Sequence, residues 1–121
     1  MSYMPRRDRI AIQKILRELK VGQELLGDSS FEDFDQNEMM KRAIAMTVIN
    51  VGELTKIISD ETRIAYPGTP WKAIAGMRDI AAHKYQTLRM EDVYNTVRID
   101  FPTYEKQLQS IYAEMIQKDN T

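Results

Sequence analysis

Apolar residues recur every three to four positions near the start of the chain, which is the spacing of one buried helix face. They are Ile12, Ile15, Leu16 and Leu19. The pattern predicts a first helix over about residues 8–25. The sequence Gly27-Asp28-Ser29-Ser30 follows, and a run of small and polar residues of this kind ends a helix.

A second, longer apolar pattern predicts a helix over about residues 36–58. Asp35 is the predicted N-cap of this helix, and Glu38 three residues later completes a capping box. The helix is apolar on more than one face, as a central helix or a helix in a dimer interface would be. Phe31 and Phe34 precede it in a polar stretch that we predict to be a loop, with both rings closing the edge of the core.

The sequence pattern in the middle of the chain predicts short helices and turns. Ser59 or Asp60 caps a third helix that ends near Tyr66, and Thr69 caps a turn that has Pro70 at its first position. We expect three side chains to anchor this turn, namely Trp71, Ala73 and Ile74. Gly76 then separates the turn from a helix over about residues 77–84.

The last helical region begins near Arg89, and Pro102 either kinks it or starts a new segment. Its apolar positions are Met90, Val93, Tyr94, Val97, Leu108, Ile111, Tyr112 and Met115. No stretch alternates apolar and polar residues as a strand does. The pattern therefore predicts an all-α protein, an up-and-down bundle of four main helices plus short helical turns.

Composition narrows the class of protein. The chain has 121 residues, which suits one domain over residues 1–121 with its core in about residues 8–116. Cysteine is absent, which excludes disulfides, a thiol nucleophile and thiolate metal ligands and permits a reducing compartment. We find no secretory signal at the start and no apolar run long enough to span a bilayer, and we expect a cytoplasmic protein.

Charge is distributed unevenly. The net charge is −1, but residues 63–89 carry five basic side chains against one acidic side chain, so the rest of the chain sums to −5. A basic patch on an acidic body fits a nucleic-acid site, with Lys72, Lys84 and Arg89 as candidate RNA-binding residues. A solvated charge cluster without a ligand gives the same pattern.

The chain has one histidine, in Arg78-Asp79-Ile80-Ala81-Ala82-His83-Lys84-Tyr85. Histidine is the side chain best suited to move a proton near neutral pH, and arginine is best suited to hold a phosphate. Asp79 and His83 are four residues apart and share a helix face, so the carboxylate can orient the imidazole. Arg78 and His83 lie about 140° apart on an ideal helix. They converge on one ligand only if the arginine reaches across, if the helix ends near His83, or if two subunits meet.

Cleavage of RNA without a metal requires a base for the 2′-hydroxyl, a cation for the phosphorane-like transition state and an acid for the leaving oxygen. A two-fold dimer supplies two histidines and two arginines to a shared cleft. Simpler interpretations exist: His83 as a helix-capping residue, Arg78 with Asp79 as a surface pair, and Tyr85 as an aromatic at the core edge. One histidine and no cysteine make zinc a poor candidate, and no glycine-rich phosphate loop is present. We therefore predict no metal and no cofactor.

Taken together, these segments resemble HEPN-domain proteins, specifically the HepT-like toxins of toxin-antitoxin pairs. The resemblance covers residues 8–115. It rests on Phe31-Glu32-Asp33-Phe34, Val51-Gly52-Glu53, the lead-in Tyr66-Pro67-Gly68-Thr69-Pro70-Trp71-Lys72-Ala73-Ile74, the R-x4-H-x-Y motif of residues 78–85, Val93-Tyr94 and Asp100-Phe101-Pro102.

The resemblance implies a HEPN fold that dimerises with its motifs in a shared cleft, and a metal-independent endoribonuclease that cuts tRNA or mRNA as the toxin of a type VII-like system. Arg78 would hold the scissile phosphate, His83 would be the general acid and base, and Asp79 would support the site. The implied partner is an MntA-type nucleotidyltransferase antitoxin that transfers AMP from ATP to Tyr85, in a complex that can be larger than the dimer. The alternative is a non-catalytic HEPN module that binds or assists such a nucleotidyltransferase.

Overall fold

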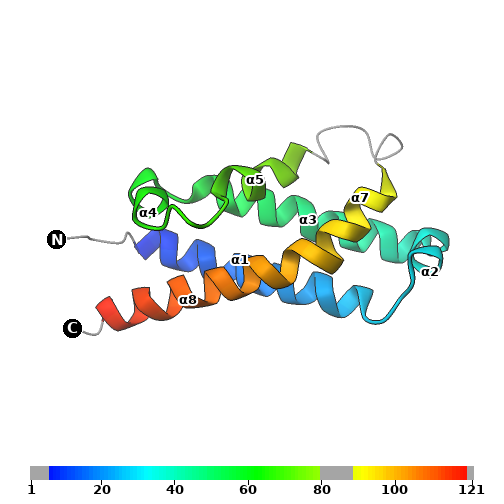
Figure 1. Ribbon diagram of the computed structural model, residues 1–121, viewed down its shortest axis with the longest axis horizontal. Helices are drawn as coiled ribbons and strands as arrows, with labels where there is room; N and C mark the ends of the chain where they lie inside the picture. Colours follow the sequence, from blue (N-terminus) through cyan, green and yellow to red (C-terminus); the bar gives the residue numbers. More distant parts are fainter. Residues whose placement is uncertain (1–5, 80–88, 120–121) are drawn as a thin grey trace.

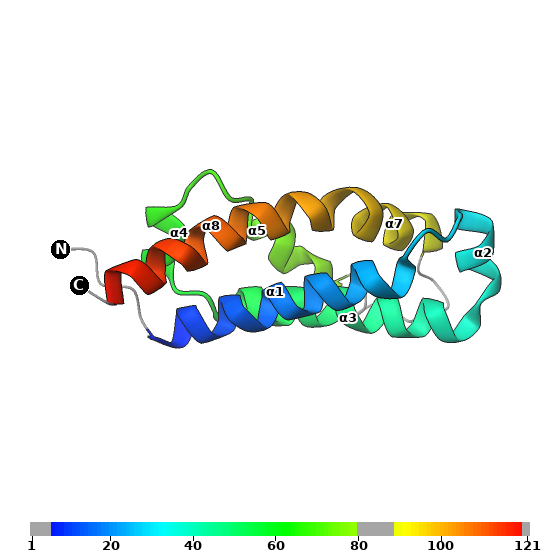
Figure 2. The same ribbon diagram turned by 90° about the horizontal axis from the view of Figure 1, so that it is seen from below.

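Long helices lying side by side make up the body of the molecule (Figures 1 and 2). The computed structural model describes residues 6–79 and 89–119, with only the backbone of Arg78. The long elements are α1 (Arg6–Leu26), α3 (Glu38–Ile57) and α8 (Phe101–Asp119), and α7 (Met90–Asn95) with the π-helical η3 (Thr96–Asp100) leads into α8. The short elements are α2 (Phe31–Gln36), α4 (Asp60–Ala65), α5 (Trp71–Ala75) and the 3-10 helix η1 (Gly76–Arg78). The all-α prediction is confirmed.

The core lies where α1, α3 and the last helical region meet. Ile12, Ile15 and Leu19 of α1 are fully buried, as the periodicity predicts, whereas Leu16 is half-buried at the edge. From α3 and α8 the core takes, among others, Ile44, Val48, Val51, Phe101, Leu108 and Met115. Burial of these apolar side chains is the main force that holds the helices together.

Gly22 of α1 marks a close approach of three helices. A Cβ placed there would lie 2.7 Å from Cε2 of Phe101 and 3.0 Å from Oγ1 of Thr47. The Thr47 hydroxyl has little freedom to move, because it donates to the Ile44 carbonyl at 2.8 Å. Glycine weakens a helix interior, so its value at this position is the space it leaves for α3 and α8.

We therefore expect Gly22→Ala to lower the free energy of unfolding by about 1–3 kcal/mol, through overpacking that exceeds the gain in helix propensity. Urea denaturation followed by circular dichroism measures the change. The control is Gly68→Ala, because a Cβ at Gly68 meets nothing within 4 Å. Equal stability of the two variants would contradict the close approach.

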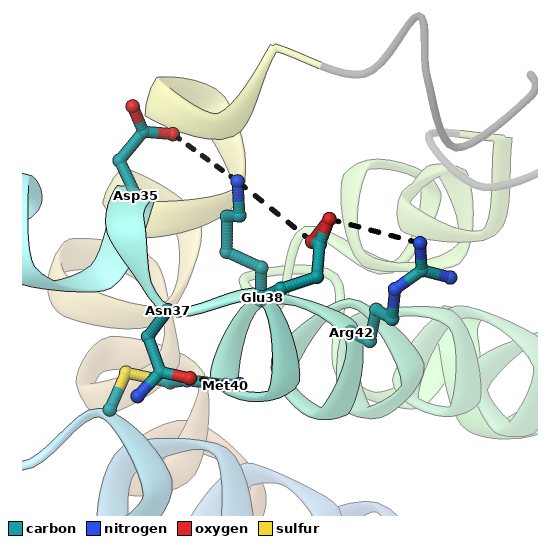
Figure 3. A network of polar contacts seen from close by, with 6 residues as sticks. Asp35, Asn37, Glu38, Met40 and Arg42 are labelled. Atoms are coloured by element: carbon teal, nitrogen blue, oxygen red, sulfur yellow. Dashed lines mark hydrogen bonds and ion pairs between the residues drawn. The ribbon is translucent and has the colours of Figure 1, made fainter.

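The connection between α1 and α3 differs from the prediction. Residues 31–36 are helical and not a loop, because the Ser30 side chain accepts a hydrogen bond from the Asp33 amide and caps α2. The predicted N-cap Asp35 is also wrong: Asn37 caps α3 by accepting from the Met40 amide at 3.0 Å (Figure 3). Phe34 is nevertheless fully buried, as expected of a ring that closes the core.

A buried carboxylate ties the start of α1 to α4. Asp8 is fully buried and accepts hydrogen bonds from the amide and hydroxyl of Ser59 and from the hydroxyl of Thr62. Of the two predicted caps it is Ser59 that caps α4, by accepting from the Thr62 amide at 3.4 Å. One carboxylate therefore fixes the position of α4, from which the chain continues toward the motif.

The last helical region runs through Pro102 without a break, so this proline does not start a separate helix. Thr96 and Phe101, at the junctions between α7, the π-helical η3 and α8, both have right-handed helical angles. The π-helical turn lies just before Pro102, which lacks the amide hydrogen that a regular helix uses. α8 continues to Asp119, beyond Met115, the last apolar position of the predicted pattern. No helix in the described part of the chain is long and apolar enough to cross a membrane.

Candidate functional site

The segment that leads into the motif is held in place from both of its ends. The indole Nε1 of Trp71 donates to the Tyr66 carbonyl at 2.9 Å, which closes the loop that contains Pro67 and Pro70. Trp71, Ile74 and Met77 are buried in the core. Both α5 and η1 pack against α3. The backbone that carries Arg78 is therefore fixed against α3.

Three details of this lead-in differ from the prediction. Thr69 does not cap α5 with its side chain: Pro70 occupies the N-cap position without a side-chain hydrogen bond, and the Thr69 carbonyl accepts from the Trp71 amide at 2.8 Å. Ala73 is exposed and anchors nothing. Gly76 has ordinary right-handed helical angles, so α5 continues directly into η1 without a break.

The structure describes only the start of the motif. Arg78 ends η1, and Asp79 continues with helical angles and an exposed side chain. The predicted residues His83, Lys84 and Tyr85 lie outside the described residues, as does most of the predicted motif helix. The convergence of Arg78 and His83 on one phosphate stays a prediction.

The basic residues near the motif fall into two kinds. Lys72 and Arg89 are exposed, and the Arg89 side chain is 75% exposed and 4.0 Å from Asp92. An ion pair this exposed contributes little to stability. Arg89 can therefore bind an anion in place of Asp92. Arg63 is different, because its guanidinium donates to the carbonyls of Thr55 and Ile58 at the end of α3. It belongs to the helix end and not to a basic patch.

A polar network at the start of α3 is a feature that the sequence did not predict (Figure 3). Lys41 Nζ lies 3.7 Å from Asp35 and 3.9 Å from Glu38, and Glu38 also pairs with Arg42 at 3.8 Å. The i,i+3 and i,i+4 spacing of Glu38 with Lys41 and Arg42 is the available sequence signal. The pairing with Asp35 crosses from α3 to α2 and depends on the observed helix boundary.

Two groups in the last helical region, Asp100 and Tyr104, have shifted pKa values. Burial raises the pKa of the Asp100 carboxyl. Burial, and then the charge of Asp100, raise the pKa of the Tyr104 phenol. These groups belong to the packing of η3 and α8. Within residues 6–79 and 89–119, no group of three histidine, cysteine or acidic side chains could hold a metal ion.

The sequence profile of a family described as "Ribonuclease HepT-like" matches residues 13–111, which include the lead-in, the whole R-x4-H-x-Y motif and most of the last helical region. The chain belongs to this family. The ribonuclease HepT-like assignment agrees with the all-α architecture described above, and it accounts for the order of the sequence landmarks.

Relatives of this ribonuclease HepT-like chain are found in bacteria and archaea. It is 33% identical to a protein of Caldanaerobacter subterraneus subsp. tengcongensis named "Putative RNase TTE0752", over 83% of this chain and 89% of the relative. It is 31% identical to "Putative RNase MJ0125" of Methanocaldococcus jannaschii, over 75% and 78%. It is 24% identical to "Probable ribonuclease HepT" of Thermococcus cleftensis, over 89% and 98%. No solved structure matched the chain.

Proposed function

We propose that the chain is an endoribonuclease toxin that cuts RNA, such as tRNA or mRNA, without a metal ion, through Arg78 and His83. The observation that carries this proposal is the ribonuclease HepT-like match across residues 13–111, within which Arg78, His83 and Tyr85 all stand at the motif spacing. The names of the relatives support RNA as the substrate class.

The reaction needs only chemistry that these side chains provide. A neutral imidazole takes the proton of the 2′-hydroxyl, and the 2′-oxygen forms a bond to the adjacent phosphorus. The guanidinium of Arg78 offsets the charge that builds on the non-bridging oxygens. The bond from phosphorus to the 5′-oxygen breaks, and an imidazolium protonates that oxygen. The products are a 2′,3′-cyclic phosphate and a 5′-hydroxyl.

The rigid lead-in supports the assigned role of Arg78. A side chain that holds a phosphate in the transition state must start from a fixed backbone, because small misplacements cost large factors in rate. Trp71, Ile74 and Met77 supply that fixation beside α3. Asp79 is exposed next to Arg78 and is available to orient His83 four residues later.

A dimer would supply both a base and an acid from one histidine per chain. Exposed apolar side chains on α3 support it: Met39 is 84% exposed, Met46 54% and Ile57 45%. The first two are seven residues apart and share one face. Apolar side chains of this size on the outer face of a helix are what a subunit interface would bury.

The proposed partner is a nucleotidyltransferase antitoxin of the MntA type. It would transfer AMP from ATP to the Tyr85 hydroxyl and release pyrophosphate. An added nucleotide is bulky and anionic, and it would stand two residues from His83. It would therefore repel the phosphates of RNA and fill the cleft. A cytoplasmic location remains part of this proposal.

The proposal is tested by purifying the protein without its partner and incubating it with tRNA and with an unstructured RNA in excess EDTA. We expect cleavage of at least one RNA in EDTA, at a rate that added Mg²⁺ does not raise. Cleavage that appears only after a divalent cation is added would contradict the metal-independent mechanism. A protein that cuts no RNA under either condition would favour the non-catalytic module.

A further inference from the structure

A pocket of about 360 Å³ opens between α2 and the start of α7. Phe31, Asp35, Arg89, Met90 and Glu91 line it. It thus combines an aromatic ring, a thioether, a cation and two carboxylates. A second pocket, of about 420 Å³, is lined by Lys20, Gln23, Glu24, Glu105 and Gln109 and has no aromatic wall. The first pocket is the one whose chemistry suits a flat, polar-edged ligand.

The α2 wall of this pocket is fixed against the last helical region. The Phe31 ring packs edge-on against Tyr94, with centroids 5.6 Å apart. The Tyr94 hydroxyl donates to the Ser29 carbonyl at 2.9 Å, and Arg98 donates to the carbonyls of Gly27 and Ser29. These bonds fix the start of α2 against α7 and η3. Phe31 is therefore held in place as one wall of the pocket, and a ligand that stacks on its ring need not order that wall first.

Asp35 is oriented by the network at the start of α3. One of its oxygens faces Lys41 Nζ at 3.7 Å, and the Lys41 side chain is only 18% exposed. The other oxygen of Asp35 points away from this ion pair (Figure 3). An ionised carboxylate only accepts hydrogen bonds, so this oxygen selects ligands that donate. Arg89 lines the pocket from the start of α7. Its guanidinium only donates hydrogen bonds and therefore suits a phosphate.

The pocket lies close to the motif along the chain. Arg89 follows Tyr85 by four residues and His83 by six. Six residues span at most about 20 Å even when fully extended, so a pocket that includes Arg89 is within a few nucleotides of His83. The last described turn before the motif and the start of α7 also lie on the same side of α3 (Figure 1).

We propose that this pocket holds an unpaired base of the RNA beside the cleavage site, and that Asp35 selects adenine or cytosine by the exocyclic amino group at C6 or C4. This inference rests on the proposed function, whose substrate it specifies. The base stacks on Phe31, as unpaired RNA bases do on aromatic side chains. Its amino group donates to the outward oxygen of Asp35, and Arg89 binds the adjoining phosphate.

The selection follows from hydrogen-bond chemistry. Adenine carries an amino group at C6 and cytosine at C4, and either can donate to a carboxylate. Guanine and uracil have a carbonyl oxygen at these positions, and an oxygen facing the Asp35 carboxylate leaves two acceptors unpaired. Asp35→Asn replaces one acceptor with an amide that donates, while the size of the side chain is unchanged. The variant can therefore accept guanine or uracil.

The experiment uses the full chain and an RNA library in which the three nucleotides on each side of one cleavage site are randomised. Sequencing of cut and uncut RNA gives the relative kcat/KM for each base at each position. For the wild type we expect guanosine and uridine to be disfavoured by about tenfold at one position, the effect of one lost hydrogen bond to a charged group. Asp35→Asn should reduce that factor to about twofold or less. Phe31→Leu should raise the Kd for the whole library about tenfold through lost stacking, which a separate binding titration measures.

The matched control is Asp33→Asn, which makes the same change on the same helix at an exposed position that does not line the pocket. It should keep the wild-type discrimination against guanosine and uridine. If wild type and Asp35→Asn cut the library with the same base preferences, the pocket does not select a base, and the proposed ribonuclease function stands without it. If the wild type neither cuts nor binds any RNA, the proposed function fails and this inference fails with it.

Discussion

Replacing His83 by alanine is expected to lower the rate of RNA cleavage by about 10²–10⁴-fold, the usual contribution of a positioned general acid or base. His83 is the only histidine in the chain, so no other imidazole can take over the proton transfer. The rate is measured under single-turnover conditions in EDTA. Thermal unfolding checks that the fold survives.

Arg78→Ala should produce a loss of comparable size, because the cation that offsets charge on the phosphate is removed. Arg78→Lys should recover only part of the rate, since an ammonium cannot bind two phosphate oxygens in the planar geometry of a guanidinium. Lys20→Ala is the control: Lys20 is exposed on α1 and lines a different pocket. Cleavage by His83→Ala at the wild-type rate would show that a contaminating nuclease, or another residue, does the chemistry.

The second large effect is expected at Tyr85. Incubation with a nucleotidyltransferase partner and ATP should add about 329 Da per AMP unit to the intact mass, and cleavage of RNA should fall to background as the modification accumulates. The reason is the negative charge and bulk introduced two residues from His83. Intact-mass spectrometry and the cleavage assay on the same samples relate the two changes.

Tyr85→Phe separates modification from damage to the fold. This variant should take up no AMP, and partner and ATP should then leave its RNA cleavage unaffected. Tyr112→Phe removes the hydroxyl of a half-buried tyrosine in α8 and should behave as the wild type. AMP found on Tyr85→Phe in wild-type amount would place the acceptor at another residue.

The long helices were predictable because the buried face of a helix places apolar residues every three to four positions in the sequence. The positions of α1 that were expected to be buried are buried, apart from the half-buried Leu16. The cap of α3 was not predictable in the same way. Asp35 and Asn37 are both good N-cap residues, and the choice between them depends on Ser30, which starts a separate helix and brings Asp35 within reach of Lys41.

The same difference between local patterns and long-range contacts holds for the candidate site. The motif and its aromatic lead-in are local patterns, and the structure confirms that Trp71 and Ile74 anchor the segment before Arg78. The pocket between α2 and α7 is lined by residues from 31–35 and from 89–91. Local sequence patterns do not predict a contact between segments so far apart in the chain. Arg63 was counted in the basic segment of residues 63–89, although it does not form part of a basic patch. A count of charges cannot tell a cation that binds helix carbonyls from one that faces solvent.

The proposed mechanism activates the RNA's own 2′-hydroxyl without a metal ion. The most direct test uses one RNA with a mapped cleavage site and its analogue with a single 2′-deoxynucleotide at that site, both incubated with the wild-type protein in EDTA. We expect cleavage of the all-ribose RNA to a 2′,3′-cyclic phosphate and a 5′-hydroxyl, and no cleavage of the analogue at that bond. Cleavage of both RNAs, or a 5′-phosphate on the product, would contradict this mechanism.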